Sequence, residues 1–375
     1  MGPSTPLIMG RPSKGYKPRI RSSRPLAMGR DKGALQPATP YPPTVERDGL
    51  YYLPPPHSLR LHQKSAFGRR CKDEGVLLTP VELIYCHWFR FIPLPEPTNE
   101  WFAEQLELNP RLEAHLIAME LMRTGHDICV PVEQLSHRFA EVPDATWGLG
   151  WPRGSPWIKE APSSQVRVHR TNDEVDWHEL LEWFDDVSDR GQDPFLCVVD
   201  DEMEGTVYQL SQPNLEGVHR APSSLSQEEQ EHVQSLLKKA SFSGTSVYLP
   251  EVTGWPLNAV GVEHFSGRML TTSEAGLFDA KAQPAEDSIS LHSFLLNLGL
   301  MLRPGFKYGS LWRAYEHPIG EEHAPWLIQP VDLAPVNWEG VCLSARLAEG
   351  VHKSWVCAFE DDRLGWRFLS IARRS

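Results

Sequence analysis

WEGVCLSARLAEGVHKSWVCAFEDDRLGWRFLSI, residues 338–371, is the stretch that decides the fold. Apolar residues at helical spacing predict a helix that opens at the first tryptophan and runs through His352. A strand over 355–359, an acidic turn over 360–365 and a second strand over 366–371 are expected to follow. This helix–strand–turn–strand unit is typical of a small mixed α+β domain.

The same order of elements occurs earlier, in WHELLEWFDDVSDRGQDPFLCVVDDEMEGTVYQL, residues 177–210. There a helix opens at Trp177, and the predicted strands cover 195–199 and 206–210 on either side of an acidic turn over 200–205. A constant offset of 161 residues aligns the two units throughout. The sequence therefore predicts an internal duplication.

The expected organisation is an arm, two repeats and a linker. Residues 1–60 are rich in Pro, Arg, Ser and Gly and are expected to form a disordered basic arm. Residues 61–212 are expected to form the first repeat, 213–225 the linker and 226–375 the second repeat, with a small C-terminal domain at about 300–375. Each repeat is predicted to be α+β, with a helical N-terminal subdomain followed by a small mixed α/β domain.

The composition is that of an ordinary soluble protein, with 41% hydrophobic and 23% charged residues among 375. No apolar run approaches the ~20 residues that a transmembrane helix needs, so no membrane contact is expected. None of the six cysteines forms a C-x-x-C pair. This favours reduced thiols in a cytoplasmic protein over a structural zinc site.

The charge is distributed unevenly along the chain. Residues 1–70 carry thirteen Lys or Arg against three Asp or Glu, although the whole chain has a net charge of −12. An acidic body is not typical of a general nucleic-acid binder, whose affinity comes mainly from phosphate neutralisation. Any RNA binding must therefore come from locally placed basic groups.

The segment RPGFKYGSLWRAY, residues 303–315, carries the most specific signal, together with His323 and ARLAEGVHK, residues 345–353. These residues resemble the catalytic domain of the archaeal tRNA-splicing endonucleases. That family has a G-F-K-[FY]-G segment leading to a tyrosine, then a histidine about ten residues later, and finally a lysine that closes a helix. Here eight residues separate the tyrosine from the histidine. The resemblance implies a tRNA-intron endonuclease with nuclease-like α/β domains, of which the one at about 300–375 is the catalytic domain.

The resemblance implies that Tyr315 is the general base, His323 the general acid and Lys353 the cation that stabilises the transition state. RNA supplies its own nucleophile, the 2′-hydroxyl, so such a site needs no metal and no other cofactor. It needs a base, an acid and a positive charge at the phosphate. The roles of Tyr315 and His323 could be exchanged. The expected products are a 2′,3′-cyclic phosphate and a 5′-hydroxyl.

The resemblance also implies two RNA-binding arginines that hold a bulged base between them. Arg346 is one, and Arg373 is preferred over its neighbour Arg374 as the other. Stacked guanidinium groups suit this task because bulged bases are already unstacked. Arg346 lies seven residues before Lys353, so both are expected on one face of the helix.

The first repeat is expected to be structural. At the offset of 161 residues, the positions of the tyrosine, histidine, RNA-binding arginine and lysine fall on Gly154, Pro162, Asp185 and Gln192. None of these residues can do the chemistry. The acidic turn of this repeat, Asp200–Glu202 (Asp200, Asp201 and Glu202), matches a family loop that docks into a basic groove of a catalytic subunit.

The expected assembly is a homodimer, because two chains would supply the four units found in the family. Its expected partner is precursor tRNA with a bulge–helix–bulge motif. Two other functions are compatible with the sequence. One is a non-catalytic structural subunit of a tRNA-splicing complex. The other is a metal-dependent nuclease, or another structured-RNA-binding protein, on a similar small α/β domain.

Overall fold

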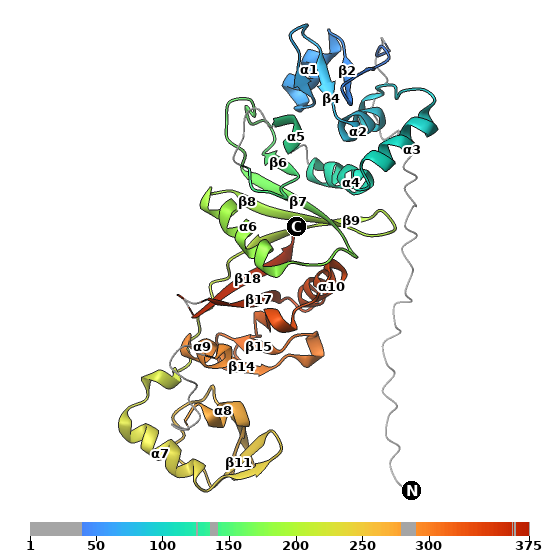
Figure 1. Cartoon of the computed structure of the whole chain (residues 1–375). Helices are drawn as coiled ribbons and strands as arrows, with labels where there is room; N and C mark the ends of the chain where they lie inside the picture. Colours follow the sequence, from blue (N-terminus) through green and yellow to red (C-terminus); the bar gives the residue numbers. More distant parts are fainter. Residues whose placement is uncertain are drawn as a thin grey trace, which may run out of the picture.

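The structure is a computed structural model that describes residues 40–124, 127–135, 142–278, 290–361, 363 and 365–374. In this part of the chain the strands form three sheets, two with four strands and one with ten. Figure 1 shows an elongated molecule with the small sheets near its two ends and the large sheet between them. Residues before 212 are called the first half here, and residues from 212 onward the second half.

The first half opens with a small sheet of order β1-β2-β4-β3, and its buried side chains include Leu53, Val76 and Leu78. Further along, α4 packs against strands of the large sheet. The elements in chain order are β1 (Val45–Arg47), β2 (Leu50–Leu53), α1 (His57–Ser65), β3 (Arg69–Arg70), β4 (Val76–Leu78), α2 (Pro80–Arg90), α3 (Thr98–Leu108), α4 (Leu112–Met122), β5 (Ile128–Pro131), α5 (Val132–Leu135), β6 (Gly148–Trp151), β7 (Ser164–Arg170), α6 (Trp177–Asp189), β8 (Asp193–Val199) and β9 (Gly205–Ser211).

The second half has its own small sheet, of order β10-β11-β13-β12, and α9 packs against β14 and β18 of the large sheet. The elements in chain order are the 3₁₀ helix η2 (Pro222–Ser224), α7 (Gln227–Leu237), β10 (Ser241–Ser243), β11 (Ser246–Pro250), β12 (Val262–His264), β13 (Gly267–Thr271), α8 (Thr272–Gly276), α9 (Leu291–Asn297), β14 (Met301–Pro304), η3 (Phe306–Tyr308), β15 (Trp312–Tyr315), β16 (Trp326–Pro330), η4 (Val331–Leu333), α10 (Trp338–Glu349), β17 (Ser354–Asp361) and β18 (Gly365–Arg373).

The two halves join in the middle of the large sheet, where β9 and β18 pair antiparallel with Leu210 opposite Ile371. Outward from this pair the order is β9-β8-β7-β6-β5 on one side and β18-β17-β16-β15-β14 on the other. On each side one pair is parallel, β7 with β8 and β16 with β17. Backbone hydrogen bonds therefore continue from one half into the other.

Helices α6 and α10 both pack on the large sheet and contribute side chains to one hydrophobic core. Trp177 and Trp338, which open these helices, are both buried. The indole Nε1 of Trp177 donates to the backbone oxygen of Pro335 at 2.9 Å, across the boundary between the halves. Arg367 of β18 forms an ion pair with Asp185 of α6 across the same boundary. The chain is thus a mixed helix-and-sheet protein, in agreement with the predicted α+β class.

Beside each small sheet, a buried glutamate in the first turn of a helix accepts hydrogen bonds from the backbone of a nearby loop. Glu82 accepts hydrogen bonds from the backbone nitrogens of Gly68 and Thr79 at 2.9 and 3.0 Å. Glu274 accepts from the equivalent backbone nitrogens of Gly261 and Thr271 at 2.9 and 2.8 Å. In both cases the threonine side chain completes a capping box at the start of the helix. Burial raises the pKa of Glu82.

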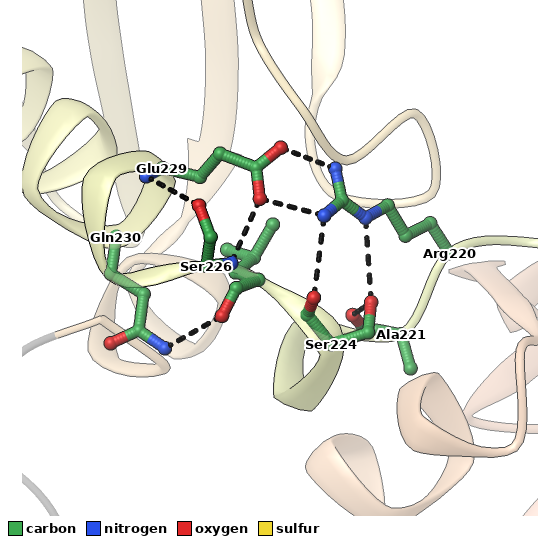
Figure 2. A network of polar contacts seen from close by, with 7 residues as sticks. Arg220, Ala221, Ser224, Ser226, Glu229 and Gln230 are labelled. Carbon is green, nitrogen blue, oxygen red and sulfur yellow. Dashed lines mark hydrogen bonds and ion pairs between the residues drawn. The ribbon is translucent and has the colours of Figure 1, made fainter.

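The segment predicted as the linker is fixed to the second half. Gly217 donates its backbone N–H to Leu298 at 2.9 Å, and Val218 donates to Glu316 at the same distance. Figure 2 shows how the segment then enters α7: Arg220 makes a two-point ion pair with the Glu229 carboxylate, which also accepts from the backbone N–H of Ser226, the N-cap residue of α7. Arg220 lowers the pKa of Glu229 to about 2. The linker is therefore part of the fold.

The predicted arm over 1–60 extends too far toward the C-terminus. Residues 1–39 lie outside the described part of the chain, but residues 45–60 form β1, β2 and the start of α1. Tyr51 and Leu53 of β2 are buried, at 2% and 0% exposure, and β2 pairs with β4. The proline-rich composition predicted a disordered segment, but the four apolar residues 50–53 that precede Pro54 form a buried strand.

Gly217→Ala should lower the free energy of unfolding by about 1–3 kcal/mol, because a Cβ atom there would stand 2.1 Å from the backbone oxygen of Gly299. The urea midpoint measures this change. Gly276→Ala is the matched control, since its Cβ would have no atom within 4 Å. Equal midpoints for the two variants would contradict the tight packing of the linker.

Candidate active site

Three neighbouring strands of the large sheet meet at one edge. Ala314 of β15 lies opposite Trp326 of β16, and Trp326 lies opposite Ser354 of β17. Tyr315 is the last residue of β15, and Lys353 directly precedes β17. Since β15 runs antiparallel and β17 parallel to β16, both residues lie at the edge where β16 begins.

Tyr315 is held by the core of the second half and is only 9% exposed. Its backbone pairs with Met301 of β14. The guanidinium carbon of Arg313 lies 5.8 Å from the centre of its ring and 5.7 Å from the ring of Tyr308. The positive charge of Arg313 therefore lies near the phenol ring of Tyr315.

Lys353 is fixed at both its backbone and its side chain. Its backbone nitrogen donates to Ala348 at 2.9 Å, at the end of α10. Its Nζ atom donates to the backbone oxygen of Ala324 at 2.6 Å. Burial, and then the charge of Arg313, lower the pKa of Lys353. The ammonium group thus lies beside the residue that follows His323.

His323 lies in the connection 316–325 between β15 and β16, and its side chain is exposed. The connection is anchored at its ends: Ala324 is buried at 1% exposure, and the Trp326 indole donates to the Glu316 carboxylate at 2.7 Å. His323 therefore projects into solvent from a fixed base.

The structure thus brings Tyr315, His323 and Lys353 to one edge of the sheet, although 38 residues of chain separate the first from the last. Within the described residues, no hydrogen bond joins the three side chains directly. A phenol, an imidazole and an ammonium at one edge of a sheet have the chemistry to move protons and stabilise negative charge.

A cavity of about 510 Å³ lies between α10, β9 and β18. Its lining includes Arg346, Arg373 and the acidic turn Asp200–Glu202. Arg346, Arg373 and the acidic turn, for which separate roles were predicted, therefore line the same cavity within one chain.

The backbone of the acidic turn is held in place by hydrogen bonds to the carboxylate of its first residue, Asp200. Oδ1 of Asp200 accepts from the backbone nitrogens of Glu202 and Glu204 at 3.0 and 2.9 Å. The side chains of Asp201 and Glu202 are exposed. Asp200 thus shapes the turn, and its two neighbours carry the charge that a binding partner can reach.

Arg373 and Arg374 have different surroundings. Arg374 pairs with Asp127 at 3.2 Å, and its guanidinium carbon lies 4.5 Å from the ring centre of Phe195. Arg373, whose backbone pairs with Tyr208, lines the cavity together with Arg346. These contacts favour Arg373 over Arg374 as the arginine that is available to a ligand.

The predicted helix through His352 is too long. Helix α10 ends at Glu349, and His352 adopts a left-handed backbone conformation with a φ of 56°. Lys353 consequently lies beyond the helix, so the argument that it shares a helix face with Arg346 does not apply. Gly350 and the strand that begins at Ser354 end the helix earlier than the apolar spacing suggested.

The first half has an edge with the same register. Gly150 of β6 lies opposite Ser164 of β7, which lies opposite Asp193 of β8. Trp151 therefore takes the tyrosine position, and Gln192 takes the lysine position. The Gln192 amide donates to a backbone oxygen of the neighbouring connection at 2.8 Å, much as the lysine does in the second half.

The constant offset of 161 residues is wrong at two positions. It assigned Gly154 and Pro162 to the tyrosine and histidine, whereas the strand register assigns Trp151 and Ala161. The cause is chain length. The segment from the start of the middle strand to the following helix is one residue longer in the first half, Ser164 to Trp177 against Trp326 to Trp338, which moves the histidine position by one. The connection 152–163 between β6 and β7 is two residues longer than 316–325, which moves the tyrosine position by two more. The register still gives this half no phenol, imidazole or ammonium at these positions.

All six cysteines are free thiols, and burial raises the pKa of Cys129 to about 12. Among the described residues, no three His, Cys, Asp or Glu side chains are grouped so that they could hold a metal ion. Over the same ranges, no helix combines the length and apolar character that a membrane span requires.

Residues 288–365 match the family model described as "tRNA intron endonuclease, catalytic C-terminal domain". This part of the chain is therefore similar to the catalytic domain of the tRNA intron endonuclease family. The matched range contains Tyr315, His323, Arg346 and Lys353, and it covers the large sheet from β14 to the start of β18.

Curated relatives of the family are similar over larger parts of the chain. The tRNA-splicing endonuclease of Thermoplasma volcanium is 27% identical over 202 residues, which are 52% of this chain and 58% of that protein. The tRNA-splicing endonuclease of Methanococcoides burtonii is 23% identical over 338 residues, 81% of this chain and 92% of that protein. That of Natronomonas pharaonis is 25% identical over 201 residues, 48% of this chain and 59% of that protein. The first and third matches thus span under three-fifths of each relative's length.

Arg374→Ala should reduce the free energy of unfolding by about 1–2 kcal/mol, because it removes both the ion pair with Asp127 and the stacking on Phe195. Arg373→Ala should change it by less than about 0.5 kcal/mol, since that side chain faces the cavity. Thermal unfolding of the two variants measures the difference. A greater loss from Arg373→Ala would reverse the assignment.

Proposed function

We propose that the chain is a tRNA-intron endonuclease that cuts precursor tRNA by transesterification at the 2′-hydroxyl. The proposal rests on one observation: Tyr315, His323 and Lys353 share an edge of the domain that matches the family's catalytic domain. The names of the three relatives support the same substrate class.

The reaction needs only groups that RNA and this edge can supply. The 2′-oxygen attacks the adjacent phosphorus as a base takes its proton. The bond from phosphorus to the 5′-oxygen breaks, and an acid protonates that oxygen. The products are a 2′,3′-cyclic phosphate and a 5′-hydroxyl, and the reaction is neither an oxidation nor a hydrolysis.

Lys353 is the group that stabilises the extra negative charge on the phosphorane. Its fixed position beside Ala324 suits this role, because a preorganised charge needs little rearrangement during the reaction. Tyr315 and His323 carry the base and acid roles. We prefer Tyr315 as the base, and the exchanged assignment uses the same three groups.

We further propose that the chain is an internal duplication whose first half is structural. The matching strand orders on the two sides of the β9–β18 pair support this, as do the equivalent capping glutamates, Glu82 and Glu274. Trp151 and Gln192 at the equivalent edge explain why one half alone would be active.

The proposed assembly is a cytoplasmic homodimer that acts on a bulge–helix–bulge RNA, with one active half facing each bulge. Arg346 and Arg373 would hold an unstacked base by guanidinium stacking, since both line one cavity. The exposed carboxylates of Asp201 and Glu202 would dock on the second copy of the chain.

Lys353→Ala should slow the cleavage of a bulge-containing precursor tRNA by at least ~10²-fold, because it removes the preorganised charge. Wild-type protein should keep its full rate in EDTA and should leave cyclic phosphate and 5′-hydroxyl ends. Single-turnover cleavage followed by end-group analysis measures all three properties. A requirement for added Mg²⁺ would refute the mechanism.

Gln192→Ala is the matched control, because Gln192 takes the lysine position in the first half. It should leave the cleavage rate unchanged. Equal damage from Gln192→Ala and Lys353→Ala would show that the first half is not merely structural. Binding of the RNA by Lys353→Ala, measured separately, should be retained.

A further inference from the structure

Arg313 is a cation beside the ring of Tyr315, and its place in the sequence predicted no role for it. It lies two residues before Tyr315 on β15, so both side chains leave the strand on the same face. Its guanidinium carbon lies 5.8 Å from the Tyr315 ring centre and 5.7 Å from that of Tyr308. The guanidinium is therefore next to one of the reacting groups proposed above.

The charge of Arg313 is not neutralised by the surrounding protein. Its Nε atom donates to the backbone oxygen of Pro304 at 3.1 Å. Among the described residues, no carboxylate lies within ion-pair distance of it, whereas Arg367 and Arg374 each have an aspartate partner. The rest of the guanidinium is thus available to an anion.

Arg313 lies close enough to Lys353 for its positive charge to act on the lysine ammonium. The charge of Arg313 is one of the two causes that lower the pKa of Lys353, after burial. Two neighbouring cations without a carboxylate between them repel each other in the free protein. An anion placed between them removes this repulsion, and a phosphate diester supplies such an anion.

The first half offers an internal comparison. Leu149 lies opposite Gln165 in β6 and β7, as Arg313 lies opposite Leu327 in β15 and β16. Leu149 is 1% exposed and carries no charge. Arg313 is therefore replaced in the first half together with the tyrosine, histidine and lysine positions.

We propose that Arg313 is the second cation of the active site and acts with Lys353 on the negative charge that develops at the scissile phosphate. The proposal rests on the endonuclease function proposed above, and it adds a fourth residue to the three that the sequence identified. The contacts of Arg313 with the Tyr315 ring and with the backbone oxygen of Pro304 orient its guanidinium before RNA binds.

Arg313→Gln should lower the single-turnover rate of precursor tRNA cleavage by about 10²-fold, and Arg313→Lys should recover part of the loss. In Arg313→Gln the decline of the rate at high pH should move to higher pH, because Lys353 loses the charge that helps to lower its pKa. In Arg313→Lys this decline should stay near its wild-type position. Rates measured between mildly acidic and alkaline pH test both statements.

Arg363→Gln is the control for loss of one positive charge, since Arg363 lies in the exposed turn at the far end of β17. It should cleave at the wild-type rate. Arg313→Leu introduces the residue type found at the equivalent position of the first half, Leu149, and serves as a second variant if Arg313→Gln unfolds. Thermal unfolding gives the folded fraction of each variant.

The outcomes separate the two proposals. If the wild type cleaves and Lys353→Ala does not, an Arg313→Gln rate equal to that of the wild type, or reduced only by its folded fraction, overturns the role of Arg313 alone. If the wild type does not cleave, both proposals fall.

Discussion

The pairing register of β15, β16 and β17 is the constraint on which the site depends. Hydrogen bonds between these strands set Ala314 opposite Trp326 and Trp326 opposite Ser354. Because an antiparallel and a parallel pair share the middle strand, the end of β15 and the beginning of β17 fall at one edge. A shift of one residue in either pair would turn a side chain to the other face of the sheet. The chemistry is therefore fixed first by backbone hydrogen bonds and only then by side-chain contacts.

The two sides of the large sheet share a strand order but differ in what they present at this edge. The first half closes its edge with Trp151, whose ring is buried, and with the amide of Gln192. The second half places a phenol and an ammonium there, and it leaves a guanidinium without a carboxylate partner in the described part of the chain. The β9–β18 pair also brings the acidic turn of the first half to the cavity that Arg346 lines in the second. The half that is proposed to be structural thus contributes to the surface on which the other half is proposed to bind RNA.

The sequence predicted well those features that depend on local pattern. Helices opening at Trp177 and Trp338 and the strand pairs that follow them are confirmed, because apolar spacing and turn residues determine them locally. It failed where tertiary contacts decide. Apolar spacing could not show that α10 ends before His352, and counting residues could not follow connections of unequal length. The role proposed for Arg313 was missed because its environment, and not its motif, distinguishes it.

The most direct test is a structure of the protein with a bulge–helix–bulge RNA that carries a 2′-deoxy nucleotide at the splice site and therefore cannot react. We expect the scissile phosphate within ~4 Å of the Lys353 ammonium in the second half, and no phosphate at Gln192 in the first. A scissile phosphate bound at the edge of the first half, or out of reach of Tyr315, His323 and Lys353, would refute the proposed active site.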